Sequence, residues 1–240
     1  MLLIFFLSVT TLARKPLEFV DLQTVTPDII QEIRLAESHN FVGHPIVGFK
    51  KAKCILTREA AKALGEVEQE IKGMSLTLKV YDCYRPMKAV NFLVNWVKDK
   101  DDQKMKEEFY PKAVKSTLFQ VGYLSSKSSH ARGSAVDLTL VKLPVAKQET
   151  FSEEMKLKNC TLPQIQRFGD NSVDMGTGYA CFDPLSYTTA PEVSADQRKN
   201  RFILKAIMEK HGFNNFAPEW WHYTFKHEPF TDKYFDFDVE

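Results

Sequence analysis

The chain has 240 residues, of which 44% are hydrophobic and 26% charged, which is the balance of an ordinary soluble globular protein. Lys and Arg number 32 and Asp and Glu 31, so the formal net charge is +1. This balance argues against a nucleic-acid backbone or an anionic membrane surface as the partner.

An apolar run over residues 2–12 opens the sequence and is followed by the basic pair Arg14-Lys15. Its length is typical of the hydrophobic part of a secretory signal peptide and is shorter than the ~20 residues that span a bilayer. No basic segment precedes the run, so a buried N-terminal strand is the alternative. We predict a signal peptide at 1–13, a single domain at 14–240 and no membrane span. The expected location is periplasmic or secreted, with the cytoplasm as the alternative.

The first third of the chain predicts a helix among short extended segments. Strand or turn segments are expected at 19–22 and 29–34, and a loop at 40–45. Thr57 is a suitable N-cap for a helix that ends near Gly73. The apolar face of this helix comprises residues at helical spacing, namely Ala60, Ala61, Leu64, Val67 and Ile71.

The next segment, residues 76–81, alternates apolar and polar side chains and predicts a half-buried strand. The strand is followed by Asp82-Cys83-Tyr84-Arg85-Pro86, and Pro86 suits the first turn of a second helix. Arg85 thus lies at a strand-to-helix junction, where functional groups are common, although a surface salt bridge is the alternative. Residues 98–108 are expected to form a charged, mostly solvated connection.

The second half of the chain contains a long stretch, residues 142–194, with few periodic patterns. Such stretches in compact domains are commonly binding loops or lids. A helix is expected from Asp196 to His211-Gly212, and the aromatic segment 216–225 is strand-like.

The four cysteines, Cys54, Cys83, Cys160 and Cys181, have no CxxC spacing, which argues against a structural zinc cluster. In an exported chain they permit up to two disulfides, and their pairing is left open. Small buried apolar residues are the alternative reading.

Two motifs far apart in the chain carry the candidate chemistry. The segment Ser-Ser-His-Ala-Arg-Gly-Ser-Ala-Val-Asp-Leu-Thr-Leu over 128–140 holds His130 and Asp137, and Glu-Trp-Trp-His near the C-terminus holds Glu219 and His222. An odd separation on one straight strand would send two side chains to opposite faces, so the chain must bend between His130 and Asp137. We predict that His130, Asp137 and His222 bind one metal ion.

Two imidazoles and a carboxylate leave a tetrahedral zinc ion one open position, as in catalytic zinc sites. Zinc can lower the pKa of water in that position to ~7, and Glu219 is the predicted general base that takes its proton. Arg85 is the predicted stabiliser of the oxyanion that forms on the attacked carbonyl. Each residue alone is ambiguous, and the four remaining histidines are expected to be solvated.

These motifs together with Tyr-Arg-Pro at residues 84–86 resemble the zinc D-alanyl-D-alanine dipeptidases of the VanX type. The resemblance runs from the Asn40-Phe41-x-Gly43 group to Phe237. It implies an α+β fold of the DD-peptidase/Hedgehog-like kind, with a mostly antiparallel sheet flanked by helices. It also implies the roles given above to the metal ligands, to Glu219 and to Arg85. In addition, it suggests that Ser128 binds the dipeptide carboxylate and Asp183 its ammonium group.

The implied reaction is hydrolysis of D-alanyl-D-alanine to two D-alanines, with a small dipeptide as partner. This chain differs from the family pattern in having Leu35 where relatives often place a tyrosine, and in a longer loop between Asp137 and Asp183. Two alternatives remain open. One is a D,D-carboxypeptidase or endopeptidase acting on peptidoglycan stem peptides, and the other is a non-catalytic zinc-binding module.

Overall fold

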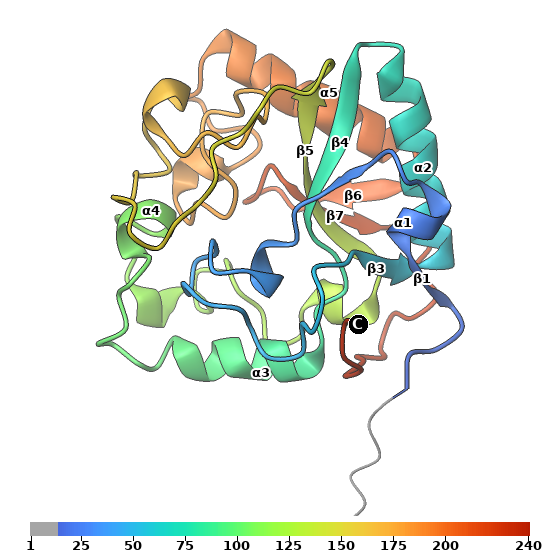
Figure 1. The fold of residues 1–240 in the computed structure, drawn as a ribbon, viewed down its shortest axis with the longest axis horizontal. Helices are drawn as coiled ribbons and strands as arrows, with labels where there is room; N and C mark the ends of the chain where they lie inside the picture. The colour runs from blue at the N-terminus through green and yellow to red at the C-terminus, as the bar shows by residue number, and fades with distance from the viewer. Residues whose placement is uncertain (1–13) are drawn as a thin grey trace, which may run out of the picture.

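The computed structural model describes residues 14–240, so the predicted signal peptide at 1–13 lies outside the described residues. The fold is the expected α+β arrangement of a mostly antiparallel sheet flanked by helices (Figure 1). Within residues 14–240, no helix is long and apolar enough to cross a membrane.

A five-stranded sheet forms the centre of the fold, in the order β2-β4-β5-β7-β6. The strands are β2 (Ile30–Gln31), β4 (Leu76–Asp82), β5 (Ala135–Lys142), β7 (His222–Phe225) and β6 (Phe213–Asn215). Strand β2 pairs with β4 in parallel, and the other neighbours are antiparallel. A separate antiparallel pair joins β1 (Phe19–Asp21) to β3 (Ile55–Thr57).

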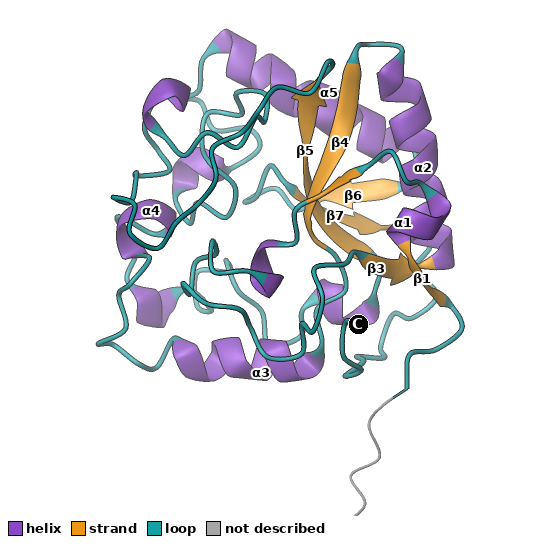
Figure 2. Cartoon of the chain, viewed as in Figure 1, coloured by secondary structure: helices purple, strands orange, loops and turns teal. Residues whose placement is uncertain are grey.

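Helices lie on both sides of the central sheet (Figure 2). Helices α2 and α5 pack together on one side, and α3 and α4 lie on the other side of β4 and β5 (Figure 1). The α-helices are α1 (Leu22–Val25), α2 (Arg58–Lys72), α3 (Met87–Trp96), α4 (Lys106–Phe109) and α5 (Ala195–Lys210). The 3-10 turns are η1 (Arg34–Ala36), η2 (Lys115–Thr117), η3 (Ser129–Arg132), η4 (Gln164–Gln166) and η5 (Pro184–Ser186).

The boundaries of α2 and α5 lie close to those expected from the sequence. Helix α2 begins directly after Thr57 and ends at Gly73, as predicted. The Thr57 hydroxyl does not cap the helix but forms a hydrogen bond with the Ser134 hydroxyl at 2.8 Å. Helix α5 begins one residue before the expected Asp196, because Ser194 forms a capping box with Gln197.

The expectation that residues 76–81 form a half-buried strand was wrong. Strand β4 is buried along almost its whole length, and even the Lys79 side chain is inaccessible to solvent. The long loop over residues 142–194 folds over the polar face of β4. There the Lys79 Nζ donates to Gln148 and Asn171 at 3.1 and 3.0 Å. The connection at 98–108 is mostly exposed, as expected, although it ends in helix α4, in which Glu108 is buried.

The last residues of the chain form a second, smaller core. Phe235, Phe237 and Val239 pack there with Phe19, Ile55 and Tyr84 beside β1 and β3. The Phe235 N–H donates to the Ala131 carbonyl at 2.9 Å, so the C-terminal segment is attached to η3. The C-terminus accordingly lies beside β1 and β3 in Figure 1.

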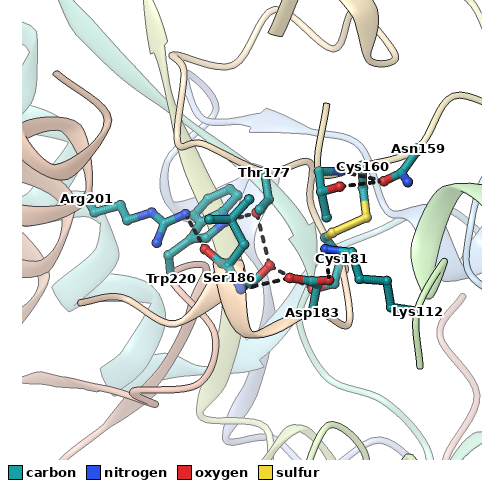
Figure 3. Close-up of a disulfide and its surroundings, with 11 residues drawn as sticks. Lys112, Asn159, Cys160, Thr177, Cys181, Asp183, Ser186, Arg201 and Trp220 are labelled. Carbon is teal, nitrogen blue, oxygen red and sulfur yellow. Dashed lines mark hydrogen bonds and ion pairs between the residues drawn. A yellow bond between two sulfur atoms is a disulfide. The ribbon is translucent and has the colours of Figure 1, made fainter. Parts of the chain in front are cut away.

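The four cysteines form two disulfides, Cys54–Cys83 and Cys160–Cys181. The first joins the residue before β3 to the residue after β4. The second joins two parts of the long stretch 142–194, and Cys181 lies two positions before Asp183 (Figure 3). The sequence permitted two disulfides, and the structure supplies their pairing.

Candidate metal centre

The pairing of β5 with β7 brings the two distant motifs together. Asp137 and His222 are direct partners in this antiparallel register. His130 lies in η3, and the chain bends between η3 and β5 at Gly133, whose φ is +80°. A Cβ atom at Gly133 would lie 2.0 Å from the Phe19 ring, so a glycine fits both the backbone conformation and the space. The expected bend between His130 and Asp137 is therefore present.

Three donor atoms converge at one point. The His130 Nε2 lies 3.1 Å from the His222 Nδ1 and 3.3 Å from the Asp137 Oδ1, and the last two atoms are 3.0 Å apart. Ligand bonds of ~2.0–2.1 Å at tetrahedral angles place donors about 3.3 Å apart. The donor set and its spacing therefore fit one Zn²⁺ with little rearrangement.

In each imidazole, the ring nitrogen that does not belong to the donor set has its own hydrogen-bond partner. The other nitrogen, His130 Nε2 or His222 Nδ1, is therefore free to bind a cation. The His130 Nδ1 donates to the Cys83 carbonyl at 2.7 Å, which leaves a lone pair on Nε2. The His222 Nε2 lies 3.2 Å from the Ser129 Oγ and 3.3 Å from the Thr224 Oγ1, and either hydroxyl can accept its proton. Both histidines are thus oriented as metal ligands commonly are.

The ionisation of these groups suits the same role. Burial lowers the pKa of His222 and favours the neutral imidazole that binds a metal. Burial alone would raise the pKa of Asp137, but the adjacent His130 and His222 hold it well below its ordinary value. Asp137 is therefore a carboxylate at neutral pH.

Glu219 lies beside the donor set without joining it. Its Oε2 is 4.0 Å from the His222 Nδ1, and its side chain is buried. Burial and the charge of Asp137 raise the pKa of Glu219 well above its ordinary value, while Arg85 acts in the opposite direction. The two neighbouring carboxyl groups thus differ in proton affinity, with Asp137 holding its charge and Glu219 binding a proton more readily.

Arg85 is held at the site by an acid that the sequence reasoning did not assign. Its Nε and Nη2 both donate to the Asp82 Oδ2, at 2.9 and 2.6 Å. The Arg85 N–H also donates to the His130 carbonyl at 3.3 Å. Asp82, at the end of β4 and three residues before Arg85, therefore fixes the guanidinium next to η3.

The candidate site contains a cavity of about 210 Å³. This volume is below the ~300–1,000 Å³ of pockets that bind drug-sized ligands. The predicted residues that line it are His130, Asp137 and His222, together with Glu219, Arg85 and Ser128. Aromatic walls come from Phe41, Tyr123, Tyr179, Phe182, Phe216 and Trp221. The cavity is suited to a small, partly apolar ligand.

Asp183 is the one predicted site residue that does not line this cavity, although Phe182 does. Its Oδ1 accepts from the Leu185 N–H at 2.9 Å at the start of η5, and its Oδ2 lies 3.1 Å from the Lys112 Nζ. Figure 3 places this ion pair beside the Cys160–Cys181 disulfide. The role of Asp183 in binding an ammonium group stays a prediction.

A second buried polar cluster, formed by Arg34, His39, Glu108 and Asp170, lines a cavity that shares Tyr179 with the cavity of the metal centre. The sequence did not predict this cluster. His39 was expected to be solvated, but it is buried, and its Nε2 donates to the Glu108 Oε1 at 2.8 Å. Arg34 and Asp170 lie in the same cluster and line a second cavity of about 280 Å³. Burial and the charge of Arg34 lower the pKa of His39 to about 2, so His39 is neutral. No local pattern in the sequence connects these residues.

Comparisons with known proteins give a consistent result. The profile of the Peptidase M15 family, described as D-ala-D-ala dipeptidase, matches residues 15–147 and 145–240. A D-alanyl-D-alanine dipeptidase of Enterococcus faecium is 31% identical over 222 residues, which cover 92% of this chain and 98% of that protein. A Streptomyces coelicolor protein of the same name is 30% identical with the same coverage. The Escherichia coli one is 29% identical over 206 residues, or 86% of this chain and 83% of that protein.

Proposed function

This chain belongs to the M15 family of D-Ala-D-Ala dipeptidases and is a peptidase, and on that premise we propose that it hydrolyses D-alanyl-D-alanine with one Zn²⁺. The ligands would be His130, Asp137 and His222. The observation that carries the proposal is the convergence of their three donor atoms, 3.0 to 3.3 Å apart, in a cavity that also contains Glu219 and Arg85.

Bound there, zinc would polarise the scissile carbonyl and make water a better nucleophile near neutral pH. Glu219 would take the proton of the attacking water and then give it to the leaving amine. Its position supports this role, because the side chain is buried beside the three donor atoms, with its Oε2 4.0 Å from the His222 Nδ1, without belonging to them.

Arg85 would donate to the carbonyl oxygen as negative charge develops on it. The ion pair with Asp82 supports this role, since a guanidinium held before the reaction needs no reorganisation when the charge appears. Removal of one such donor elsewhere costs about 2.7–4 kcal/mol in transition-state stabilisation. Ser128, which lines the same cavity, is proposed to bind the substrate carboxylate.

A D,D-carboxypeptidase acting on stem peptides is the second candidate. The observation that favours it is the ion pair of Asp183 with Lys112 outside the cavity lining, because an acid already paired offers less to a free substrate ammonium. A peptide with a blocked amino terminus would then be accepted as readily as the free dipeptide.

A substrate panel separates these functions. Zinc-loaded protein would be incubated with D-Ala-D-Ala, its N-acetyl derivative and a D-Ala-D-Ala-terminated pentapeptide, and released D-alanine would be measured. Cleavage of the free dipeptide alone is expected. Cleavage of the pentapeptide would favour the carboxypeptidase, and cleavage of none would favour a non-catalytic zinc-binding module.

We also propose that the chain acts in the periplasm or outside the cell. The two disulfides support an oxidising compartment, and the apolar run at the N-terminus supports export. Mass spectrometry of the exported protein should find an N-terminus near Arg14. An intact Met1 would remove the signal peptide from the proposal.

A further inference from the structure

Tyr179 contacts the carboxylate oxygen of Asp137 that the imidazoles leave free. The Asp137 Oδ1 lies 3.3 Å from the His130 Nε2 and 3.0 Å from the His222 Nδ1. The Tyr179 hydroxyl donates to the other oxygen, Oδ2, at 3.1 Å. The two oxygens of one carboxylate therefore have different partners, and rotation of the carboxylate would break both sets of contacts.

The Tyr179 ring is itself held in place. It stacks on Tyr81 of β4 with the ring centroids 4.2 Å apart and the planes 12° from parallel. Its centroid lies 5.6 Å from that of Trp221, which meets it edge-on. The Tyr81 hydroxyl donates to Asp170 and not to the donor set, so the support that Tyr81 gives Tyr179 is the stacking of its ring. Tyr179 thus presents its hydroxyl to Asp137 from a rigid position.

Tyr179 also separates two cavities. It lines both the 210 Å³ cavity of the metal centre and the neighbouring 280 Å³ cavity of the Arg34 and Glu108 cluster. Its side chain is buried, so the hydroxyl reaches Asp137 away from bulk solvent. Because water does not readily reach this buried position, the Asp137 oxygen would have no replacement partner if the Tyr179 hydroxyl were removed. The loss of this hydrogen bond would therefore cost free energy.

We infer that Tyr179 is a positioning residue that holds Asp137 as a ligand through one oxygen and so sets the metal affinity of the site. The inference rests on the proposed zinc site. A residue that forms a hydrogen bond with a metal ligand orients that ligand. Its removal typically weakens metal binding or activity 10- to 100-fold. Without the hydroxyl, Asp137 could turn and offer both oxygens to the cation.

The test compares Tyr179→Phe with Tyr81→Phe. The first variant keeps the stacked ring and removes only the hydroxyl on Asp137, and the second removes a hydroxyl from the adjoining ring without touching the donor set. Zinc dissociation constants would be measured by competition with a chromophoric chelator. We expect about 10- to 100-fold weaker binding for Tyr179→Phe and wild-type affinity for Tyr81→Phe.

A spectroscopic measurement adds a readout that general destabilisation would not move. Cobalt(II) in place of zinc should give weaker visible absorption in Tyr179→Phe, because a carboxylate that binds through both oxygens raises the coordination number. Wild-type affinity and spectrum in Tyr179→Phe, or equal losses in both variants, would overturn the inference. A wild-type chain that binds no zinc would overturn the metal site with it. A zinc-binding wild type that leaves D-Ala-D-Ala intact would refute the dipeptidase alone.

Discussion

The buried Glu108 carboxyl group should make the stability of the folded chain depend on pH. Burial raises its pKa from 4.5 to about 7, against the opposing charges of Arg34 and Lys158. The folded state therefore disfavours the ionised form. The contribution of Glu108 to stability is fully present below pH 4.5, is lost as the pH rises towards 7, and stays lost above it.

The magnitude follows from the displacement of the pKa. From 4.5 to about 7, at 1.36 kcal/mol for each pH unit, the cost of the ionised carboxylate approaches ~3 kcal/mol. Glu108→Gln is neutral at every pH and can still accept the hydrogen bond from His39. Its free energy of unfolding minus that of the wild type should therefore rise by up to ~3 kcal/mol between pH 4 and pH 8.

Urea unfolding followed by tryptophan fluorescence would measure this difference, with the disulfides intact and both proteins in the same metal state. Subtraction of the wild-type curve cancels the titration of all other groups. Glu107→Gln, an exposed neighbour on the same helix, is the matched control and should give a flat difference. A flat or falling curve for Glu108→Gln would mean that Glu108 is ionised in the folded protein as a partner of Arg34.

Three further variants test the candidate site and the disulfide between Cys54 and Cys83. Glu219→Gln should lower kcat by about 10²–10⁴-fold while metal analysis still finds one zinc per chain, and loss of the zinc would make Glu219 a ligand. Arg85→Ala should lower kcat by about 10²–10³-fold with a smaller rise in KM, whereas a change confined to KM would indicate ground-state binding. Replacing Cys54 and Cys83 together by Ser opens a loop with a sequence separation of 29 and should lower the unfolding free energy by ~3–4 kcal/mol in urea denaturation. An unchanged urea midpoint would show that the disulfide contributes little.

The sequence predicted features that depend on neighbouring residues. Helix α2 begins after Thr57 and ends at Gly73, where the sequence predicted its limits, although the Thr57 hydroxyl bonds to Ser134 and does not cap the helix. The bend before β5 follows from the spacing of His130 and Asp137 around Gly133. The convergence of the two motifs was also predictable, because histidine and carboxylate side chains in two distinctive segments indicate a shared cation.

The remaining features depend on contacts between distant segments. Lys79 alternates with apolar residues and so looks solvent-facing, but the long loop supplies its hydrogen-bond acceptors. His39 likewise has a partner 69 positions away in the chain. Asp82 and Tyr179 belong to residue types that are common everywhere, so only their positions in the folded chain distinguish them.

The place of β7 in the sheet has a consequence for biosynthesis. This strand lies between β5 and β6, yet it is the last of the three to be made. Until they emerge from the ribosome, one edge of the apolar strand β5 has no partner, and such an edge is prone to pair with other chains. His222 also arrives with this strand, so a nascent chain cannot complete the donor set. The three donor atoms can therefore come together only after β7 has been made.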